Sequence, residues 1–289
     1  MKDLFKKYNA DFLEENIQQK IAVIANNSHQ YANKDTLKKA FSLIDLTSLN
    51  TEDNNNRIKA ICKKVNDINN HYPDIPNVAA ICVFPALVSC VKENLNAPET
   101  GIASVGGGFP SSQTFLDIKI DECKRAIQAG ATEVDIVLSV GEFFEENYAY
   151  CFNEIKSIKT VIGNNHLKVI LETGALRSSQ EIWKASILAM EAGADFIKTS
   201  TGKQSPAATT EAVYVMTRAI NAFYKATGKK IGIKPAGGIS TPEDALAYFA
   251  IVKENLGDEW LNSKLFRIGA SRLANNLLTA IYQQEINYF

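Results

Sequence analysis

Five charged residues interrupt stretches of the sequence that are otherwise apolar. They are Asp45, Asp135, Glu172, Lys198 and Lys234, and each falls within or at the carboxyl end of a short run of apolar residues. Such runs are typical of strands whose two faces are both buried. Because an unpaired charge is costly to bury, we expect the five groups to meet in one polar cluster. That cluster is either a structural network of ion pairs or a reactive centre.

The two lysines favour a reactive centre. Ammonium groups that lie close together disfavour each other's charged form, which lowers the pKa of a lysine. An unperturbed lysine has a pKa of about 10.4 and is almost fully protonated at neutral pH. A lysine with a pKa near about 7 would be a neutral amine that attacks carbonyl carbons. A carboxylate such as Asp135 could then move protons. The charges alone do not decide whether Lys198 or Lys234 is the nucleophile.

A repeating pattern of strands and helices must position these residues. The expected strands cover residues 41–45, 78–83, 102–105, 133–138, 167–172, 195–199, 230–234 and 265–269. The spacing between them leaves room for one crossover helix each, as in repeated βα units. Eight regular units predict an α/β fold, a (β/α)8 TIM barrel over residues 37–289, in preference to an open doubly wound sheet. The active site of such a barrel lies at the carboxyl ends of its strands.

Helix signals support this division. Ser178 followed by Glu181 has the spacing of a capping box, and Thr241-Pro242 supplies an N-cap and a first-turn proline before a helix that Gly257 ends. Residues 1–36 carry a helical apolar pattern of their own. We therefore expect a short helical extension that packs against the outside of the barrel.

Glycine-rich segments follow three neighbouring strands. They contribute the candidate phosphate-binding residues Gly202, Lys203, Gly237, Gly238, Gly269 and Ser271. Barrels often bind phosphate with the loops after strands seven and eight, where backbone N–H groups and a helix N-terminus converge. A lone Gly-Gly is more often a tight turn, but three such loops on adjacent units favour a phosphate site.

The totals exclude other classes of function. The chain has 31 Lys and Arg against 32 Asp and Glu, so its net charge of −1 offers no basic field for nucleic acid or an anionic membrane. The longest apolar stretch, residues 78–91, is too short to span a bilayer. The five cysteines are scattered and the three histidines have no metal-ligand spacing. We expect reduced thiols, no metal, no membrane association and a cytoplasmic location.

Two segments make the interpretation more specific: DFIKTSTGK at residues 195–203 and KPAGG at residues 234–238. Together with Asp45 in IDLT, Asp135 in EVD and FRIGAS at residues 266–271, they resemble the 2-deoxy-D-ribose-5-phosphate aldolase family of class I aldolases. The likeness runs from about residue 40 to residue 280.

The resemblance implies a reaction and a set of roles. The reaction is the reversible cleavage of 2-deoxy-D-ribose 5-phosphate to D-glyceraldehyde 3-phosphate and acetaldehyde, without a cofactor. The resemblance makes Lys198 the Schiff-base lysine, Lys234 the group that perturbs its pKa and Asp135 a proton relay. The glycine-rich loops would hold the phosphate, and we add Asp45 to the substrate-binding residues. The partners are then small sugar phosphates and aldehydes, and a homodimer is one expected assembly.

Two alternatives and two local questions stay open. A phosphosugar isomerase would use a carboxylate base instead of an amine, and a non-catalytic relative would bind the sugar phosphate without turnover. Arg272 stands where some family members have a second serine, and either strengthens phosphate binding or faces solvent. Tyr288 lies near the chain end, where a frayed tail is favoured over one folded across the pocket.

Overall fold

Eight parallel strands form the centre of the molecule in a computed structural model that describes residues 2–289. The strands are β1 (Ile44–Thr47), β2 (Ala80–Val83), β3 (Gly101–Val105), β4 (Glu133–Val137), β5 (His166–Ile170), β6 (Phe196–Lys198), β7 (Gly232–Lys234) and β8 (Ile268–Ala270). From β1 to β7 each strand pairs with the next along the chain, and β1 pairs with β8. Parallel bridges from Ile233 to Phe266 and from Ala236 to Gly269 join β7 to β8 and close the predicted barrel.

The predicted strands overlap the observed ones, with the largest errors at the first and the last. Residues 41 and 42 end helix α3 (Lys34–Ser42) instead of beginning β1. Phe41 is fully buried, so a buried helix end and a buried strand form one continuous apolar run, which periodicity cannot divide. The β8 ladder begins at Ile268, although Phe266 already bridges to β7.

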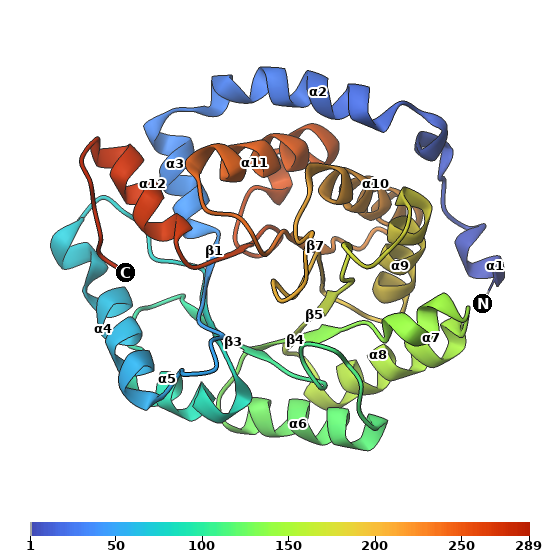
Figure 1. Ribbon diagram of the computed structural model, residues 1–289, viewed down its shortest axis with the longest axis horizontal. Helices are drawn as coiled ribbons and strands as arrows, with labels where there is room; N and C mark the ends of the chain where they lie inside the picture. Colours follow the sequence, from blue (N-terminus) through green and yellow to red (C-terminus); the bar gives the residue numbers. More distant parts are fainter. Residues whose placement is uncertain (1) are drawn as a thin grey trace.

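A ring of helices surrounds the strands (Figure 1). It comprises α4 (Asn55–His71), α5 (Val88–Asn94), α6 (Leu116–Gln128), α7 (Val140–Phe144), α8 (Tyr148–Ile162), α9 (Ser179–Glu191), α10 (Thr210–Thr227), α11 (Pro242–Leu256) and α12 (Leu273–Tyr282). Short 3-10 turns lie at Pro85–Leu87 and Asp258–Trp260.

The predicted caps at α9 and α11 have different outcomes. Thr241 and Asp244 form a complete capping box at α11. At α9, Ser178 accepts from the Glu181 N–H, but the Glu181 carboxylate accepts from the N–H of Arg177. The capping box predicted at Ser178 is therefore wrong in its second half.

The residues before the barrel form a strap across its outside. The strap contains α1 (Lys2–Phe5), a 3-10 turn at Asp11–Glu14, α2 (Ile17–Asn27) and a 3-10 turn at Ser28–Tyr31. Figure 1 shows α2 lying along the outer side of α10 and α11. Apolar side chains of the strap join the core of the barrel. Tyr8, which lies between α1 and the first 3-10 turn, stacks its ring on Phe223 with 5.7 Å between ring centroids. Met1 lies outside the described residues.

The boundary predicted at residue 36 falls inside α3, which runs directly into β1. The division into an extension at 1–36 and a barrel at 37–289 stays a prediction.

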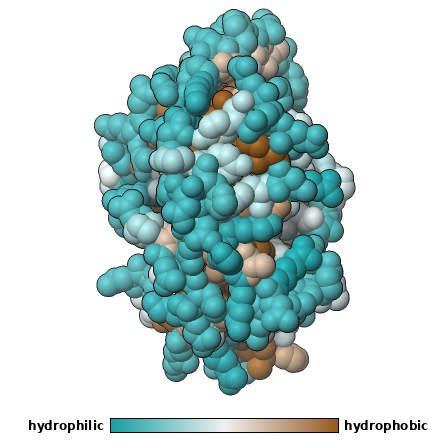
Figure 2. Space-filling view, turned by 90° about the vertical axis from the view of Figure 1, so that its left-hand side faces the viewer, coloured by the Kyte–Doolittle hydropathy of each residue, from teal (hydrophilic) through white to brown (hydrophobic). Residues whose placement is uncertain are grey.

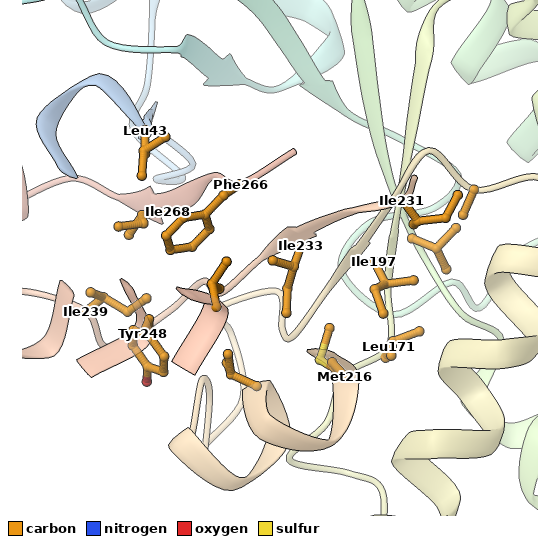
Figure 3. Packing of buried hydrophobic residues seen from close by; sticks show 14 of the residues in the cluster. Leu43, Leu171, Ile197, Met216, Ile231, Ile233, Ile239, Tyr248, Phe266 and Ile268 are labelled. Carbon is orange, nitrogen blue, oxygen red and sulfur yellow. The ribbon is translucent and has the colours of Figure 1, made fainter. Parts of the chain in front are cut away.

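Two apolar layers hold the barrel together. Figure 3 shows the outer layer, in which Ile197, Ile233, Phe266 and Ile268 pack against side chains such as Met216 from the surrounding helices. The inner layer is apolar on one side only, where β2 and β3 contribute Ala80, Cys82, Ala103 and Val105. Strands β1, β4, β5, β6 and β7 and the residue before β8 contribute charged side chains that meet one another, so the barrel interior divides into an apolar half and a charged half.

The outer surface is mainly hydrophilic on the face over α4 and α12, where only small separate apolar areas appear (Figure 2). Within residues 2–289, no helix has the length and apolar character needed to cross a bilayer.

The C-terminal tail is docked, so the expectation of a frayed end at Tyr288 is wrong. The Tyr288 hydroxyl donates to the carbonyl of Lys64 on α4 at 2.8 Å. The side chain of Asn275 on α12 accepts from the N–H groups of Tyr288 and Phe289. These bonds fix the tail between α4 and α12.

Candidate active site

Lys198 and Lys234 share one carboxylate. Each lysine nitrogen lies 2.8 Å from Oδ2 of Asp135. Lys198 ends β6, Lys234 ends β7 and Asp135 is the third residue of β4. The register places Lys198 directly beside Lys234, because β6 and β7 are adjacent strands. All three side chains are almost completely buried.

A second tier of charges lies beside this group, of which the sequence interpretation found Asp45 and missed Glu133, Lys168 and Arg267. Lys168 on β5 is 3.0 Å from Oδ1 of Asp135 and also donates to Glu133. Arg267 reaches Asp45 at 2.6 Å and Glu133 at 2.7 Å, and Asp45 is 2.5 Å from the nitrogen of Lys234. These bonds join Lys168, Lys198, Lys234 and Arg267 to Asp45, Glu133 and Asp135. We call these seven residues the barrel cluster.

The environments of the lysines differ in the direction in which they move the pKa. Burial lowers the pKa of Lys198, the charge of Lys234 adds to this effect, and the attraction of Asp135 opposes it without reversing it. Burial also disfavours the charge on Lys234, but Asp135 and Asp45 together outweigh it and raise the pKa of that lysine. Lys168 also has a raised pKa, because burial is outweighed by Asp135, Glu133 and Asp45. Lys198 is therefore the lysine of the three that most readily becomes a neutral amine.

A pocket of about 820 Å³ opens beside Lys198. Its other walls come from the segments after β1, β6, β7 and β8, and from α4, α12 and Phe289. Besides Lys198, the described residues that line it include the cations Arg57, Lys64, Lys203 and Arg272, but no aspartate or glutamate. In a chain whose net charge is −1, this local excess of positive charge favours an anionic ligand. Asp135 and Lys234 are not part of the lining and lie behind Lys198.

The predicted phosphate-binding loops meet at this pocket, which Gly202, Lys203, Gly237, Gly238, Gly269 and Ser271 all line. Gly202 and Gly237 have φ of +75° and +85°, and a Cβ on Gly237 would lie 3.0 Å from the Cα of Gly202. The close contact of the loops after β6 and β7 therefore requires glycine. Ser271 lies just before α12, whose first N–H groups are suited to an anion.

Gly269 has a second steric role. A Cβ at this position would lie 2.7 Å from the Cβ of Ala236 and 3.1 Å from Cε of Lys234. A side chain here would therefore push against the lysine that contacts both Asp45 and Asp135. The residue lines the pocket as predicted, but it also makes room for the barrel cluster.

Two other predictions need correction or reassignment. Glu172 does not join the lysines, because β5 already ends at Ile170. The carboxylate of Glu172 accepts from the backbone N–H and the hydroxyl of Thr201 instead. It thereby shapes the loop that carries Gly202 and Lys203. Asp45 does lie with the lysines, but it is fully buried and does not line the pocket. The Lys203 side chain spans the pocket and donates to the carbonyl of Leu49.

A lysine with a lowered pKa, at the carboxyl end of a barrel strand and beside an electropositive pocket, is the arrangement of a barrel enzyme that attacks carbonyl compounds with an amine. The model of the DeoC/LacD family aldolases matches residues 39–256. The chain belongs to this family.

Named relatives agree with this assignment. Over 257 residues the chain is 43% identical to the deoxyribose-phosphate aldolase of Homo sapiens, which covers 85% of this chain and 80% of the human protein. The solved structure of "QR15, an Aldolase" is 27% identical, with a TM-score of 0.68 over 84% of this chain and 96% of that one. A tetrameric deoxyribose phosphate aldolase from Aeropyrum pernix has the same fold, with a TM-score of 0.67 over 89% of this chain and 96% of that one, at 22% identity.

Proposed function

We propose that this chain is a class I aldolase that reversibly cleaves 2-deoxy-D-ribose 5-phosphate to D-glyceraldehyde 3-phosphate and acetaldehyde. The observation that carries the proposal is Lys198, a buried lysine of lowered pKa on the wall of a positively charged pocket. The named relatives support the choice of substrate. An isomerase needs a carboxylate base facing its substrate, and no carboxylate side chain lines this pocket.

Lys198 is the proposed nucleophile. Its neutral amine attacks C1 of the open-chain sugar, and loss of water gives an iminium ion. The C3 hydroxyl then loses its proton, the bond between C2 and C3 breaks, and glyceraldehyde 3-phosphate leaves. The two carbons left on Lys198 form an enamine, which takes a proton at C2 and is hydrolysed to acetaldehyde and free lysine. The positive nitrogen of the iminium accepts the electron pair, so the step needs no metal.

Asp135 and Lys234 are the proposed partners of Lys198. Asp135 contacts both lysines, and its pKa stays well below the usual range because Lys168, Lys198 and Lys234 outweigh the effect of burial. It therefore acts as an ionised acceptor that passes protons directly or through water. Lys234 holds its own proton and disfavours a second positive charge on Lys198.

The 5-phosphate is proposed to bind at Gly202, Gly237, Gly238 and Ser271, with Lys203 and Arg272 supplying positive charge. This arrangement would place the aldehyde carbon toward Lys198 at the other end of the pocket. We propose no substrate contact for Asp45, which lies behind the lysines.

Borohydride trapping tests the proposal. The protein is incubated with acetaldehyde or 2-deoxyribose 5-phosphate, reduced, digested and mapped by mass spectrometry. A reduced adduct on Lys198 supports both chemistry and nucleophile. An adduct on Lys234 keeps the chemistry and reverses the roles, whereas binding of the sugar phosphate without any adduct favours a non-covalent isomerase or a binding protein.

A homodimer and a cytoplasmic location are also proposed. Two large apolar side chains, Phe115 and Ile118, are 78% and 52% exposed at the start of α6, and pairing of two chains would remove such groups from water. Sedimentation velocity tests the dimer, and fractionation of cells with an antibody against the chain tests the location.

A further inference from the structure

The barrel cluster contains one more cation than carboxylates. Lys168, Lys198, Lys234 and Arg267 face Asp45, Glu133 and Asp135, and all seven side chains are at most 6% exposed. A buried net charge is costly, so the cluster is most stable when one proton is missing. Arg267 cannot lose its proton in a protein. The missing proton must therefore come from a lysine.

The contacts select Lys198 as that lysine. Lys168 contacts three carboxylates and Lys234 contacts two. Lys198 shares Asp135 with both other lysines. The remaining titratable neighbour of Lys198 is the thiol of Cys82 on β2, whose pKa burial raises, so that it stays neutral. Among the described residues, Asp135 is thus the one carboxylate paired with Lys198, and it is shared with two other lysines.

Arg267 and Glu133 lie at the opposite end of the cluster from the pocket. Glu133 is the first residue of β4 and Arg267 directly precedes β8, whereas Lys198 is the last residue of β6. Neither residue lines the pocket. Beyond them lies His166, whose ring nitrogen is 3.5 Å from Glu133 and whose side chain is 44% exposed. Arg267 and Glu133 thus belong to the charge balance without access to a substrate.

We propose that Arg267 and Glu133 are positioning residues that act through Asp45, Asp135 and Lys168 to set the number of protons in the barrel cluster, with Arg267 favouring the neutral amine of Lys198 and Glu133 favouring its protonated form. This inference rests on the proposed Schiff-base function of Lys198. Arg267 supplies a cation that cannot lose its proton. With Lys168 and Lys234 it balances the three carboxylates, so a proton on Lys198 would be a fourth positive charge. Glu133 opposes Arg267 by adding negative charge to the same cluster.

Two substitutions should move the pKa of Lys198 in opposite directions. Arg267→Met removes a fixed positive charge, so the cluster is balanced with Lys198 protonated and the pKa of Lys198 rises. Glu133→Gln removes a negative charge, so protonated Lys198 becomes less favourable and its pKa falls. We expect each substitution to shift the pKa of Lys198 by about one pH unit, for a single charge at this depth. On the acid limb of the pH–rate profile, where the rate falls as Lys198 becomes protonated, this is about tenfold in rate.

The experiment measures the rate of acetaldehyde trapping on Lys198 by borohydride as a function of pH. Acetaldehyde has no titrating group, so the acid limb reports the enzyme. We expect the limb to move to higher pH in Arg267→Met, to lower pH in Glu133→Gln and back toward wild type in the double variant. Arg267→Lys keeps the charge and should keep the wild-type limb. Arg125→Met and Glu259→Gln, which remove exposed partners of surface ion pairs, are matched controls that should leave the limb unmoved.

A purely structural role would give a different pattern. Damage to packing would lower the rate equally at all pH values, and Arg267→Lys would not restore it. Equal loss at every pH, or shifts of the same sign in both single variants, would overturn the proposal. If Arg267→Met does not fold, Glu133→Gln decides alone, and an unmoved limb overturns the proposal. Wild-type protein that forms no adduct on Lys198 would instead refute the proposed function.

Discussion

The molecule buries lysines in two places, and the two sites differ in their charge balance. In the barrel cluster, four cations meet three carboxylates. Between α6 and α8, Lys119 meets Glu154 alone at 2.6 Å, with both side chains 1% exposed. The hydroxyls of Ser112 and Ser139 accept the remaining hydrogen bonds of Lys119. One buried lysine thus has a full set of partners, whereas Lys198 shares its carboxylate with two other lysines.

This difference separates a structural lysine from a reactive one. Burial alone is common to both sites and therefore does not identify a nucleophile. The balanced pair of Lys119 and Glu154 joins the segment before α6 to the end of β4 through Ser112 and Ser139. The barrel cluster leaves Lys198, beside a pocket, without a carboxylate of its own. We expect substitutions at the first site to change stability and substitutions at the second to change chemistry.

The largest expected effect is that of Lys198→Leu. Loss of the amine should lower turnover of 2-deoxyribose 5-phosphate by about 10⁴-fold or more, because no other group can form the imine. The thermal unfolding midpoint should stay close to that of wild type, since a neutral Lys198 and a leucine leave the cluster with the same charge. A coupled assay for glyceraldehyde 3-phosphate and circular dichroism measure the two quantities. Near-normal turnover in the variant would show that Lys198 is not the nucleophile.

Asp135→Asn should have the next largest effect. The amide keeps the shape of the side chain but cannot accept a proton, so kcat should fall by about 10²- to 10⁴-fold. Binding of the sugar phosphate, measured by calorimetry, should weaken much less, because Asp135 does not line the pocket. An unchanged kcat would remove Asp135 from the proton relay.

Lys119→Leu should change stability instead of activity. It leaves the carboxylate of Glu154 buried without its cation, which costs about 3–5 kcal/mol. Urea unfolding measures this loss, and the rate per folded molecule should stay close to wild type. The double variant Lys119→Leu with Glu154→Leu should recover most of the stability, because an apolar pair can replace a buried ion pair. A large loss of turnover in the folded variant would contradict the division between the two sites.

The pH dependence gives the smallest effect. Because the pKa of Lys198 is lowered, the neutral amine is present at lower pH than in a free lysine, and trapping by acetaldehyde should fall about tenfold per unit only below that pKa. Lys119→Leu should leave the position of this limb unchanged. A rate that keeps rising up to pH about 10.4 would mean that the interior does not activate Lys198.

The sequence predicted the barrel well because its signals are local. Continuous apolar runs marked all eight strands, and the errors fell where a buried helix end joins β1 and where β8 begins with isolated bridges. Lys198 and Lys234 were found because charges at the carboxyl ends of strands stand out, and Asp135 because it interrupts an apolar run within β4. Glu172 satisfied the same rule, but β5 ends before it, and at φ of +54° its backbone has left the strand.

Lys168, Glu133 and Arg267 were missed for a physical reason. Glu133 begins β4, Lys168 is the middle residue of β5 and Arg267 precedes β8, so none of them lies at the carboxyl end of a strand, where the rule for barrel enzymes directs attention. Glu133 and Asp135 are two residues apart on β4 and must face the same side, and that periodicity was an available signal. Their pairing with Lys168 and Arg267 depends on the register of neighbouring strands, which the sequence does not specify.

The seam between β7 and β8 has a consequence for how the molecule opens. Isolated bridges replace a continuous ladder there, and Asp45 on β1 ties Lys234 to Arg267 across the gap. The seam has two isolated bridges where β4 and β5 have five paired positions, so we expect its amide protons to exchange with deuterated water faster than those of β4 and β5. The barrel would then open locally first at this seam, where its charged residues meet. Neutralising one of these residues should make the amide protons of β7 and β8 exchange faster.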